Sequence, residues 1–388
     1  MLGSKNMKVL IAGDYSPRTD LQSTIDAGKF KDIFGEVMPI VEQSDYSIVN
    51  FETTIADSDD QKIQKSGPHL KTNTSSIDAL QCAGFDCVTL ANNHFRDYGD
   101  TGVNKTIEYL DKCSIDWVGG GRSFKEASRV LYKTINNETL AIINACEHEF
   151  SIAEDGHGGC NPIDEIQQFY SITEARKKAD YVVVIIHGGH EHFNLPSPRM
   201  KKTYCYFIDV GADAVINHHQ HCFSGFEIHN GKPIFYGLGN FCFPSRVESN
   251  NPTFWNKGYM VFLAFIQGRV DFDIVPYIQC FNNSKVQILK DRDSFNKELK
   301  AINEIISDDI ALEKEVADFY LKNQRKTQYI WEPYKNKITK ALYYFHLLPS
   351  RVTSSGSKLT MFYNCLTCES HRDKMMCVLK KCAYAYKE

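Results

Sequence analysis

Short apolar runs that end abruptly in polar side chains are the main pattern of this chain. Two of them end in histidine: Tyr181–Ile186 stops at His187, and Ala212–Ile216 runs into Asn217-His218-His219-Gln220-His221. Runs of five or six β-forming residues are typical of parallel strands that are buried on both faces. Ligands of open α/β sheets bind beyond the carboxyl ends of such strands, so these histidines are candidate metal ligands.

The first third of the chain repeats this pattern. Strands are predicted over Met7–Ala12, Ser44–Asn50 and Asp86–Leu90, and they lead to Asp14, Glu52 and Asn93-His94. Taken alone, Asp14 also suits a helix N-cap or a turn. A further strand is predicted over Ile115–Val118. Helical spacing and stop signals predict helices over Phe34–Val41, Ser75–Ala83, Gly102–Lys112 and Asn161–Ala179, the last with Pro162 in its first turn.

Antiparallel pairs follow later in the chain. Val130–Ile135 and Leu140–Ala145 flank Asn136-Asn137, and Gly225–His229 and Pro233–Tyr236 flank Asn230-Gly231, which is a strong hairpin signal. Tyr259–Ile266 and Val270–Tyr277 are predicted to pair in the same way. Parallel strands with helices, followed by hairpins, predict a mixed α/β core of two stacked sheets covered by helices.

The composition changes near residue 291, which predicts a core domain over residues 7–285 and a helical region over residues 291–388. The helical region is expected to contain Ser294–Ser307, Asp309–Lys322, Tyr334–Leu348 and Leu359–Lys387. Its cysteines occur as Cys365-x2-Cys368 and Cys377-x4-Cys382. Zinc binding is one interpretation of these pairs, but the irregular second spacing favours cysteines packed in a helical core.

Composition narrows the class of protein. The chain has 388 residues, of which 43% are hydrophobic and 24% charged, as in an ordinary soluble globular protein. Its formal net charge of −4 gives no general attraction to nucleic acid or to an anionic membrane, so neither is an expected partner. No apolar run reaches the roughly 18 residues of a membrane span, and the N-terminus lacks a signal-peptide pattern. The 13 scattered cysteines suggest reduced thiols, so we expect a cytoplasmic protein.

Polar residues collect at five predicted strand ends. They are Asp14, Glu52, Asn93, His94, His187, Glu191, His219 and His221. A single histidine at a strand end is more often a structural residue, but this combination of carboxylates, an amide and imidazoles suits divalent ions such as Mn, Fe or Zn. A pair of such ions can activate a water and bind both oxygens of an in-line displacement at phosphorus.

The order of these motifs resembles the CapA family of bacterial capsule and poly-γ-glutamate synthesis proteins. The shared motifs are Gly13-Asp14, Asn50-Phe51-Glu52-Thr53, Leu90-Ala91-Asn92-Asn93-His94 with Asp97-Tyr98-Gly99, His187-Gly-Gly-His-Glu191, Gly211-Ala-Asp213, His219-Gln-His221 and Tyr236-Gly-Leu-Gly-Asn240-Phe241. The resemblance spans about residues 7–280. It implies a calcineurin-like metallophosphoesterase fold: a four-layer αββα sandwich of mixed sheets, here with a C-terminal helical appendage.

The resemblance also implies roles for individual residues. Asp14 matches the first strand-end acid, and Glu52 matches the carboxylate that bridges two ions. Asn93, His187, His219 and His221 match metal ligands, and His94 matches the histidine that protonates the leaving group. Asp14 and Glu191 are further candidates for the catalytic step.

Two departures from the metallophosphoesterase pattern concern the metal ligands. Ser16 stands where a histidine usually follows the first aspartate, and Phe95 stands where an acid usually follows the Asn-His pair. We therefore expect one or two ions of Mn, Fe, Zn or Mg, with one tight site and one weak or absent site. Glu191 or His190 is a candidate to compensate.

The function implied by the resemblance is a metal-dependent, phosphoesterase-like hydrolase linked to capsule or poly-γ-glutamate biosynthesis. The alternative is a non-catalytic or transferase-type assembly factor that keeps the fold as a scaffold. The expected substrate is an anionic small molecule or polymer, and the protein is expected to act with capsule or polysaccharide biosynthesis machinery. Arg18, Arg96 and Asn240 are candidate substrate-binding residues, together with Lys71, although cations such as these three more often belong to the solvated surface.

Overall fold

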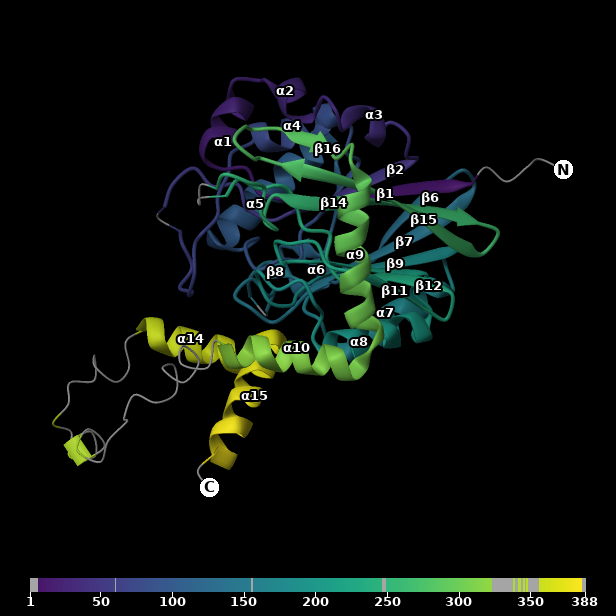
Figure 1. Ribbon diagram of the computed structural model, residues 1–388. Helices are drawn as coiled ribbons and strands as arrows, with labels where there is room; N and C mark the ends of the chain where they lie inside the picture. The colour runs from purple at the N-terminus through teal and green to yellow at the C-terminus, as the bar shows by residue number, and fades with distance from the viewer. Residues whose placement is uncertain are drawn as a thin grey trace.

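The computed structural model describes residues 6–59, 61–154, 156–245, 249–322, 338, 341–342, 345, 347 and 356–385. Two mixed sheets form its centre (Figure 1). The first has the order β16 (Val286–Ile288), β15 (Arg269–Gln279), β14 (Lys257–Ile266), β1 (Met7–Tyr15), β2 (Tyr46–Phe51), β3 (Cys87–Thr89) and β4 (Asp116–Val118), with β13 (Asn240–Cys242) beside β1.

The second sheet is also mixed. It has the order β11 (Phe226–His229), β12 (Lys232–Phe235), β10 (Ala214–His218), β9 (Tyr181–His187), β7 (Glu138–Cys146) and β6 (Leu131–Ile135). A small third sheet pairs β5 (Gly120–Gly121) with β8 (Gly159–Cys160). Parallel pairing of β7, β9, β10 and β12 leaves antiparallel strands at both edges of the second sheet.

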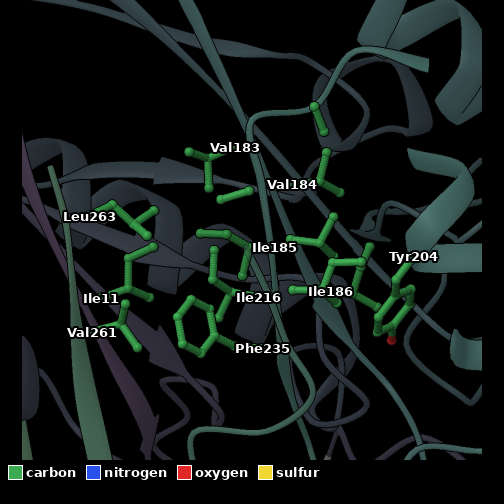
Figure 2. Close-up of a cluster of buried hydrophobic side chains, with 14 of the residues drawn as sticks. Ile11, Val183, Val184, Ile185, Ile186, Tyr204, Ile216, Phe235, Val261 and Leu263 are labelled. Carbon is green, nitrogen blue, oxygen red and sulfur yellow. The ribbon is translucent and has the colours of Figure 1, made fainter. Parts of the chain in front are cut away.

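Side chains alternate across each strand, and central strands such as β2, β9 and β10 are buried on both faces. In β1, Val9 and Ile11 belong to the core between the sheets, whereas Leu10 and Ala12 belong to the core beneath the N-terminal helices. Figure 2 shows Ile185, Ile216 and Phe235 of the second sheet near Ile11, Val261 and Leu263 of the first, while Ile186 lies beside Tyr204.

Helices cover the outer faces of both sheets. The first sheet is covered by α1 (Thr19–Asp26), α2 (Phe30–Phe34), α3 (Met38–Val41), α4 (Ser75–Ala83) and α5 (Gly99–Cys113). The second is covered by α7 (Glu165–Arg176) and α8 (Pro198–Val210), and a short helix α6 (Phe124–Ala127) lies beside β5 and β8. This arrangement confirms the predicted α/β sandwich of two mixed sheets between helical layers.

The first of the C-terminal helices runs along the side of the sandwich, and the others gather at one end of it (Figure 1). These helices are α9 (Arg292–Ser307), α10 (Asp309–Lys322), α14 (Gly356–Thr367) and α15 (Glu369–Ala385). Apolar side chains of α9 and α10 belong to the same core as the strands of both sheets. Most of the predicted helix Tyr334–Leu348 lies outside the described residues. The division at residues 285–291 stays a prediction.

Several element boundaries differ from the prediction. The three hairpins form as predicted. The predicted helix Phe34–Val41 is instead the pair α2 and α3, because Pro39 has no N–H and fits only the first turn of a new helix. Pro162 precedes α7, whose N-cap is Asp164. The predicted helix Leu359–Lys387 is divided into α14 and α15 at Cys368.

Within the described residues, no helix combines the length and the apolar character needed to cross a lipid bilayer.

Candidate functional site

The carboxyl ends of strands from both sheets bring the predicted metal ligands together. In the first sheet, Asp14 of β1 is in register with Asn50 of β2 and Asn240 of β13. In the second sheet, His187 ends β9 in register with His218 at the end of β10. The two sheets meet here, since the Asn50 Nδ2 lies 2.8 Å from Asp14 Oδ1 and 3.2 Å from His187 Nδ1.

Glu52, His187 and His219 form a first candidate ligand group. Their ligand atoms lie within 4.8 Å of one another. His187 Nε2 is 3.0 Å from His219 Nδ1 and 3.1 Å from Asn93 Oδ1. Burial and the neighbouring imidazoles, His219 first among them, hold the pKa of His187 well below its usual value. His187 is therefore neutral, which is the form of imidazole that coordinates a metal.

Asp14, Glu52 and His221 form a second candidate group, so Glu52 is shared by both. His221 Nδ1 donates to Asn240 Oδ1 over 2.9 Å, which leaves Nε2 as the ligand atom, 3.6 Å from Glu52 Oε1. Asn240 is fully buried and also donates to the His221 carbonyl. The structure thus places Asn240 behind His221, where it orients the ring; its predicted contact with substrate stays a prediction.

The pKa values of the two acids in the second group are shifted in opposite directions. Burial alone would raise the pKa of Asp14, but His218, His221 and Asn50 hold it below its usual value. Burial and the nearby Asp14 raise the pKa of Glu52 well above its usual value. Both carboxylate oxygens of Glu52 are buried without a hydrogen-bond partner among the described residues. A carboxylate of this kind is costly in the folded protein unless a cation accompanies it, so the residues present fit a divalent metal.

The loop that carries the paired histidines has a strained backbone. His219 and His221 have φ values of 91° and 55°, a region that side chains other than glycine rarely adopt. Asn217 supports this loop, because its Nδ2 donates to the carbonyls of Gly188, His218 and Tyr236. Both imidazoles lie close to Glu52, because each belongs to a ligand group that contains this acid.

His94 lies beside the ligand groups and is held by an acid. Its Nδ1 is 2.7 Å from Asp97 Oδ2 and 3.1 Å from Lys65 Nζ, and Lys65 and Asp97 form a buried ion pair. Burial and the Lys65 ammonium lower the pKa of His94, despite the opposing charge of Asp97. With Nδ1–H donated to Asp97, Nε2 is the nitrogen that can exchange a proton.

A cavity of about 530 Å³ opens beside these residues. His219 of the first ligand group lines it, together with Asn93 and His94. The rest of the lining includes the basic or imidazole side chains of Lys65, His190, His192, His371 and Lys374 and the acids Glu149 and Glu191. The Glu191 side chain is half exposed and 3.9 Å from His192 Nε2. His190 is bound instead to Tyr320 of α10, with 3.0 Å between Nε2 and the hydroxyl oxygen.

The three predicted substrate-binding cations do not line this cavity. The Arg18 guanidinium donates to the Pro244 carbonyl and lies over the Phe243 ring. Arg96 lies in a neighbouring cavity with one nitrogen 3.6 Å from Asp100, and Lys71 pairs with Asp59. Their predicted roles in substrate binding stay predictions.

Sequence reasoning missed several residues of this region. His218 Nδ1 lies 3.2 Å from Asp14 Oδ1, at the carboxyl end of β1. His218 stands in the same histidine run as His219 and His221, so the run itself was a signal. Lys65 and the loop after β7 had no comparable signal, because their place at the site depends on packing with distant segments.

Glu147 and His148, in the loop after β7, form hydrogen bonds with the start of α15. Buried Glu147 accepts hydrogen bonds from the backbone N–H and the hydroxyl of Ser370 and pairs with Arg199 of α8. Arg199 Nε also donates to Asp373 of α15 over 2.7 Å. Next to it, His148 donates from N and Nδ1 to the carboxylate of Glu369. Because Glu147 satisfies the first turn of α15, a new helix starts at Glu369.

Comparisons with known proteins agree with the motif order. The model of the family described as bacterial capsule synthesis protein PGA_cap matches residues 8–245. The chain is 33% identical over 219 residues to the capsule biosynthesis protein CapA of Bacillus anthracis, covering 54% of this chain and 53% of that protein. It is 34% identical over 237 residues to the PGA biosynthesis protein CapA of Bacillus subtilis (strain 168), covering 60% and 61%. The chain thus spans a little over half the length of these relatives.

A solved structure shows a more distant likeness. The calcineurin-like phosphoesterase YfkN from Bacillus subtilis aligns with a TM-score of 0.41 and 14% identity, covering 78% of this chain and 99% of that one. At this score the likeness supports no argument about activity.

Proposed function

Because the chain belongs to the bacterial capsule synthesis protein family, we propose that it is a metal-dependent, phosphoesterase-like hydrolase that serves capsule or poly-γ-glutamate biosynthesis. The observation that carries the proposal is the shared acid. Two ligand groups meet at Glu52, whose buried oxygens have no hydrogen-bond donor among the described residues. A pair of divalent ions would hold both groups together.

The ligands would be divided between two positions. Asn93, His187, His219 and Glu52 would hold the tighter ion, and Asp14, His221 and Glu52 the weaker one, with Asn240 orienting His221. When bound, such ions supply a water of lowered pKa and polarise the phosphoryl or acyl oxygen under attack.

The other residues would handle protons and charge. Asp97 fixes the His94 ring, so that Nε2 is the atom that gives a proton to the leaving group. An anionic substrate raises the pKa of a nearby imidazole, which offsets the lowering by burial and Lys65. The basic and imidazole side chains around the cavity suit such a substrate. Glu149 and Glu191 also line the cavity, and their negative charges limit where the anionic group of the substrate can lie.

The experiment combines metal content with turnover. The purified chain is analysed for bound metal and titrated with Mn²⁺, and hydrolysis of an aryl phosphodiester is followed with and without chelator. We expect one tight and one weak site, and turnover that depends on metal. His219→Ala should lose both tight metal and turnover, whereas His229→Ala, on the surface beside Asp209, should lose neither.

The assembly-factor alternative is tested by the same variants. The match to family members named for capsule and PGA biosynthesis favours a role in polymer synthesis, with or without catalysis. Full biological function of His219→Ala and His94→Ala would support the scaffold and overturn the hydrolase. Two equally tight ions in the titration would overturn the unequal division of ligands.

A further inference from the structure

A third cluster of metal-ligating side chains shares no residue with the two strand-end ligand groups. Glu149 of the loop after β7, Cys368 and His371 place ligand atoms within 4.8 Å of one another. Cys368 is the residue between α14 and α15, and His371 lies in the first turn of α15. The spacing of three residues puts both side chains on one side of the helix start. The core supplies one member of this cluster and the C-terminal helices supply two.

The donor set is chemically distinct from the strand-end groups. It combines a thiol, an imidazole and a carboxylate, and thiolate ligands select Zn²⁺ and other thiophilic ions over Mg²⁺ or Mn²⁺. Cys368 is buried, with 2% of its surface exposed. Glu149 and His371 also line the cavity, so a fourth ligand can come from that side.

Some polar atoms in and beside this cluster have weak hydrogen bonds or none among the described residues. His371 Nδ1 is 3.5 Å from Glu149 Oε1, and the Asn364 amide lies 2.9 Å from the same nitrogen. The Asn364 Oδ1 is buried without a hydrogen-bond partner among the described residues. The Cys368 Sγ contacts Glu147 Oε2 at 3.6 Å, which is a weak interaction for a buried thiol beside two carboxylates. Arg199 already balances the charge of Glu147, so the carboxylate that a cation here would neutralise is that of Glu149.

We propose that Glu149, Cys368 and His371 bind a thiophilic divalent cation of the zinc type, which fastens α14 and α15 to the loop beside the cavity. On binding, the Cys368 S–H bond breaks, its proton goes to solvent, and the sulfur forms a bond to the metal. This site uses Cys368 with His371, and not the cysteine pair Cys365-x2-Cys368. Cys365 belongs to no ligand group among the described side chains, and the Cys382 side chain lies outside them.

The test uses the full chain, stripped of metal and titrated with Co²⁺ alone. A thiolate bound to Co²⁺ gives a near-ultraviolet charge-transfer absorption that carboxylate and imidazole ligands do not give. We expect this absorption in the wild type and its loss in Cys368→Ser. Cys365→Ser is the matched control, since it removes a buried thiol of the same helix pair and should keep the absorption. Zn²⁺ should displace Co²⁺ and remove the signal.

Further variants separate this site from the proposed hydrolase site. His219→Ala should lose turnover and keep the thiolate absorption, whereas Cys368→Ser should bind one equivalent less of zinc and keep the strand-end metal. If Cys368→Ser does not fold, His371→Gln should weaken Zn²⁺ binding at least tenfold while the thiol remains. Absence of the absorption in the wild type, or its survival in Cys368→Ser, would overturn the proposal and leave a hydrogen-bonded contact between loop and helix.

Discussion

Among individual residues, Glu52 is buried with neither carboxylate oxygen hydrogen-bonded to a described residue. Asp14 shares its burial but receives hydrogen bonds from Asn50 and from the backbone of His219. Glu52 has neighbouring imidazole nitrogens at 3.6 and 3.8 Å, beyond hydrogen-bond distance. This position is suited to a ligand that two ions share. The contribution of Glu52 to the stability of the protein should therefore depend on whether metal is bound.

Glu52→Gln should separate these two effects. The neutral amide avoids a buried charge, so the metal-free variant should melt at the same temperature as the wild type or higher. The rise in Tm on adding Mn²⁺ should be largely lost, because both ligand groups lose their common member. Thermal unfolding with and without Mn²⁺ measures both. Asp271→Asn, an exposed acid on β15, should change neither, and an unchanged metal response in Glu52→Gln would contradict the shared-ligand assignment.

His94→Gln should reduce kcat by about 10²- to 10⁴-fold, which is the usual contribution of a general acid or base. Bound metal should stay the same, because His94 belongs to neither ligand group. Steady-state kinetics and elemental analysis of the same preparation test this. His69→Gln removes a ring that is bonded to the Ile63 carbonyl and does not line the cavity, so it should leave kcat unchanged. Loss of metal in His94→Gln would mean that the ring is a ligand.

At the scale of elements, the docking of α15 depends on a buried ionic network. Glu147 is 4% exposed and has Arg199 and the start of α15 as its partners. Such a network adds little to the free energy of unfolding compared with an apolar contact of similar size. Removing one partner is strongly destabilising, because it leaves the other charge buried and unpaired. This explains why α15 begins where it does, although residues 359–387 have no strong helix breaker.

Arg199→Ala should destabilise the protein by roughly 3 kcal/mol, because it leaves Glu147 buried without its cation. Urea unfolding measures the difference. The control is Lys177→Ala, which removes an exposed pair with Glu174 and should cost less than about 1 kcal/mol. Equal effects of the two substitutions would show that Arg199 is not part of the docking contact.

At the scale of the whole molecule, the C-terminal helices share a core with the sheets. The buried cluster that contains strand residues of both sheets also includes Phe295, Leu299, Ile302 and Ile306 of α9 and Leu312, Val316 and Tyr320 of α10. Side chains of this kind each contribute about 1.5–3 kcal/mol on burial. Their sum is as large as the roughly 5–15 kcal/mol that stabilises a typical protein.

A chain that ends at residue 290 should therefore fail to unfold cooperatively, whereas a chain that ends at residue 322 keeps α9 and α10 and should fold. Circular dichroism during thermal unfolding distinguishes the two. A cooperative transition in the shorter chain would support residues 7–285 as an independent domain. Its absence would show that the helical region and the sheets form one folding unit.

The sequence by itself determined the longer strands, the hairpins and the residues at the strand ends, but not the short strands β5, β8, β13 and β16. The predicted features follow from local alternation, turn residues and motif order, which act over a few positions and are therefore readable along the chain. The sequence also contains signals for α8, a helix that was not among the predicted ones. Ser197 caps this helix by accepting a hydrogen bond from the N–H of Met200, and Pro198 and Gly211 mark its two ends.

The tertiary structure alone decided which groups meet. It placed His218 against Asp14, Lys65 against Asp97, and Cys368 and His371 against Glu149. It also removed Arg18 and Lys71 from the cavity by giving them other partners. Some of these contacts join segments that are more than two hundred residues apart in the sequence. Their pairing depends on how two sheets and the C-terminal helices pack, and no local pattern encodes that packing.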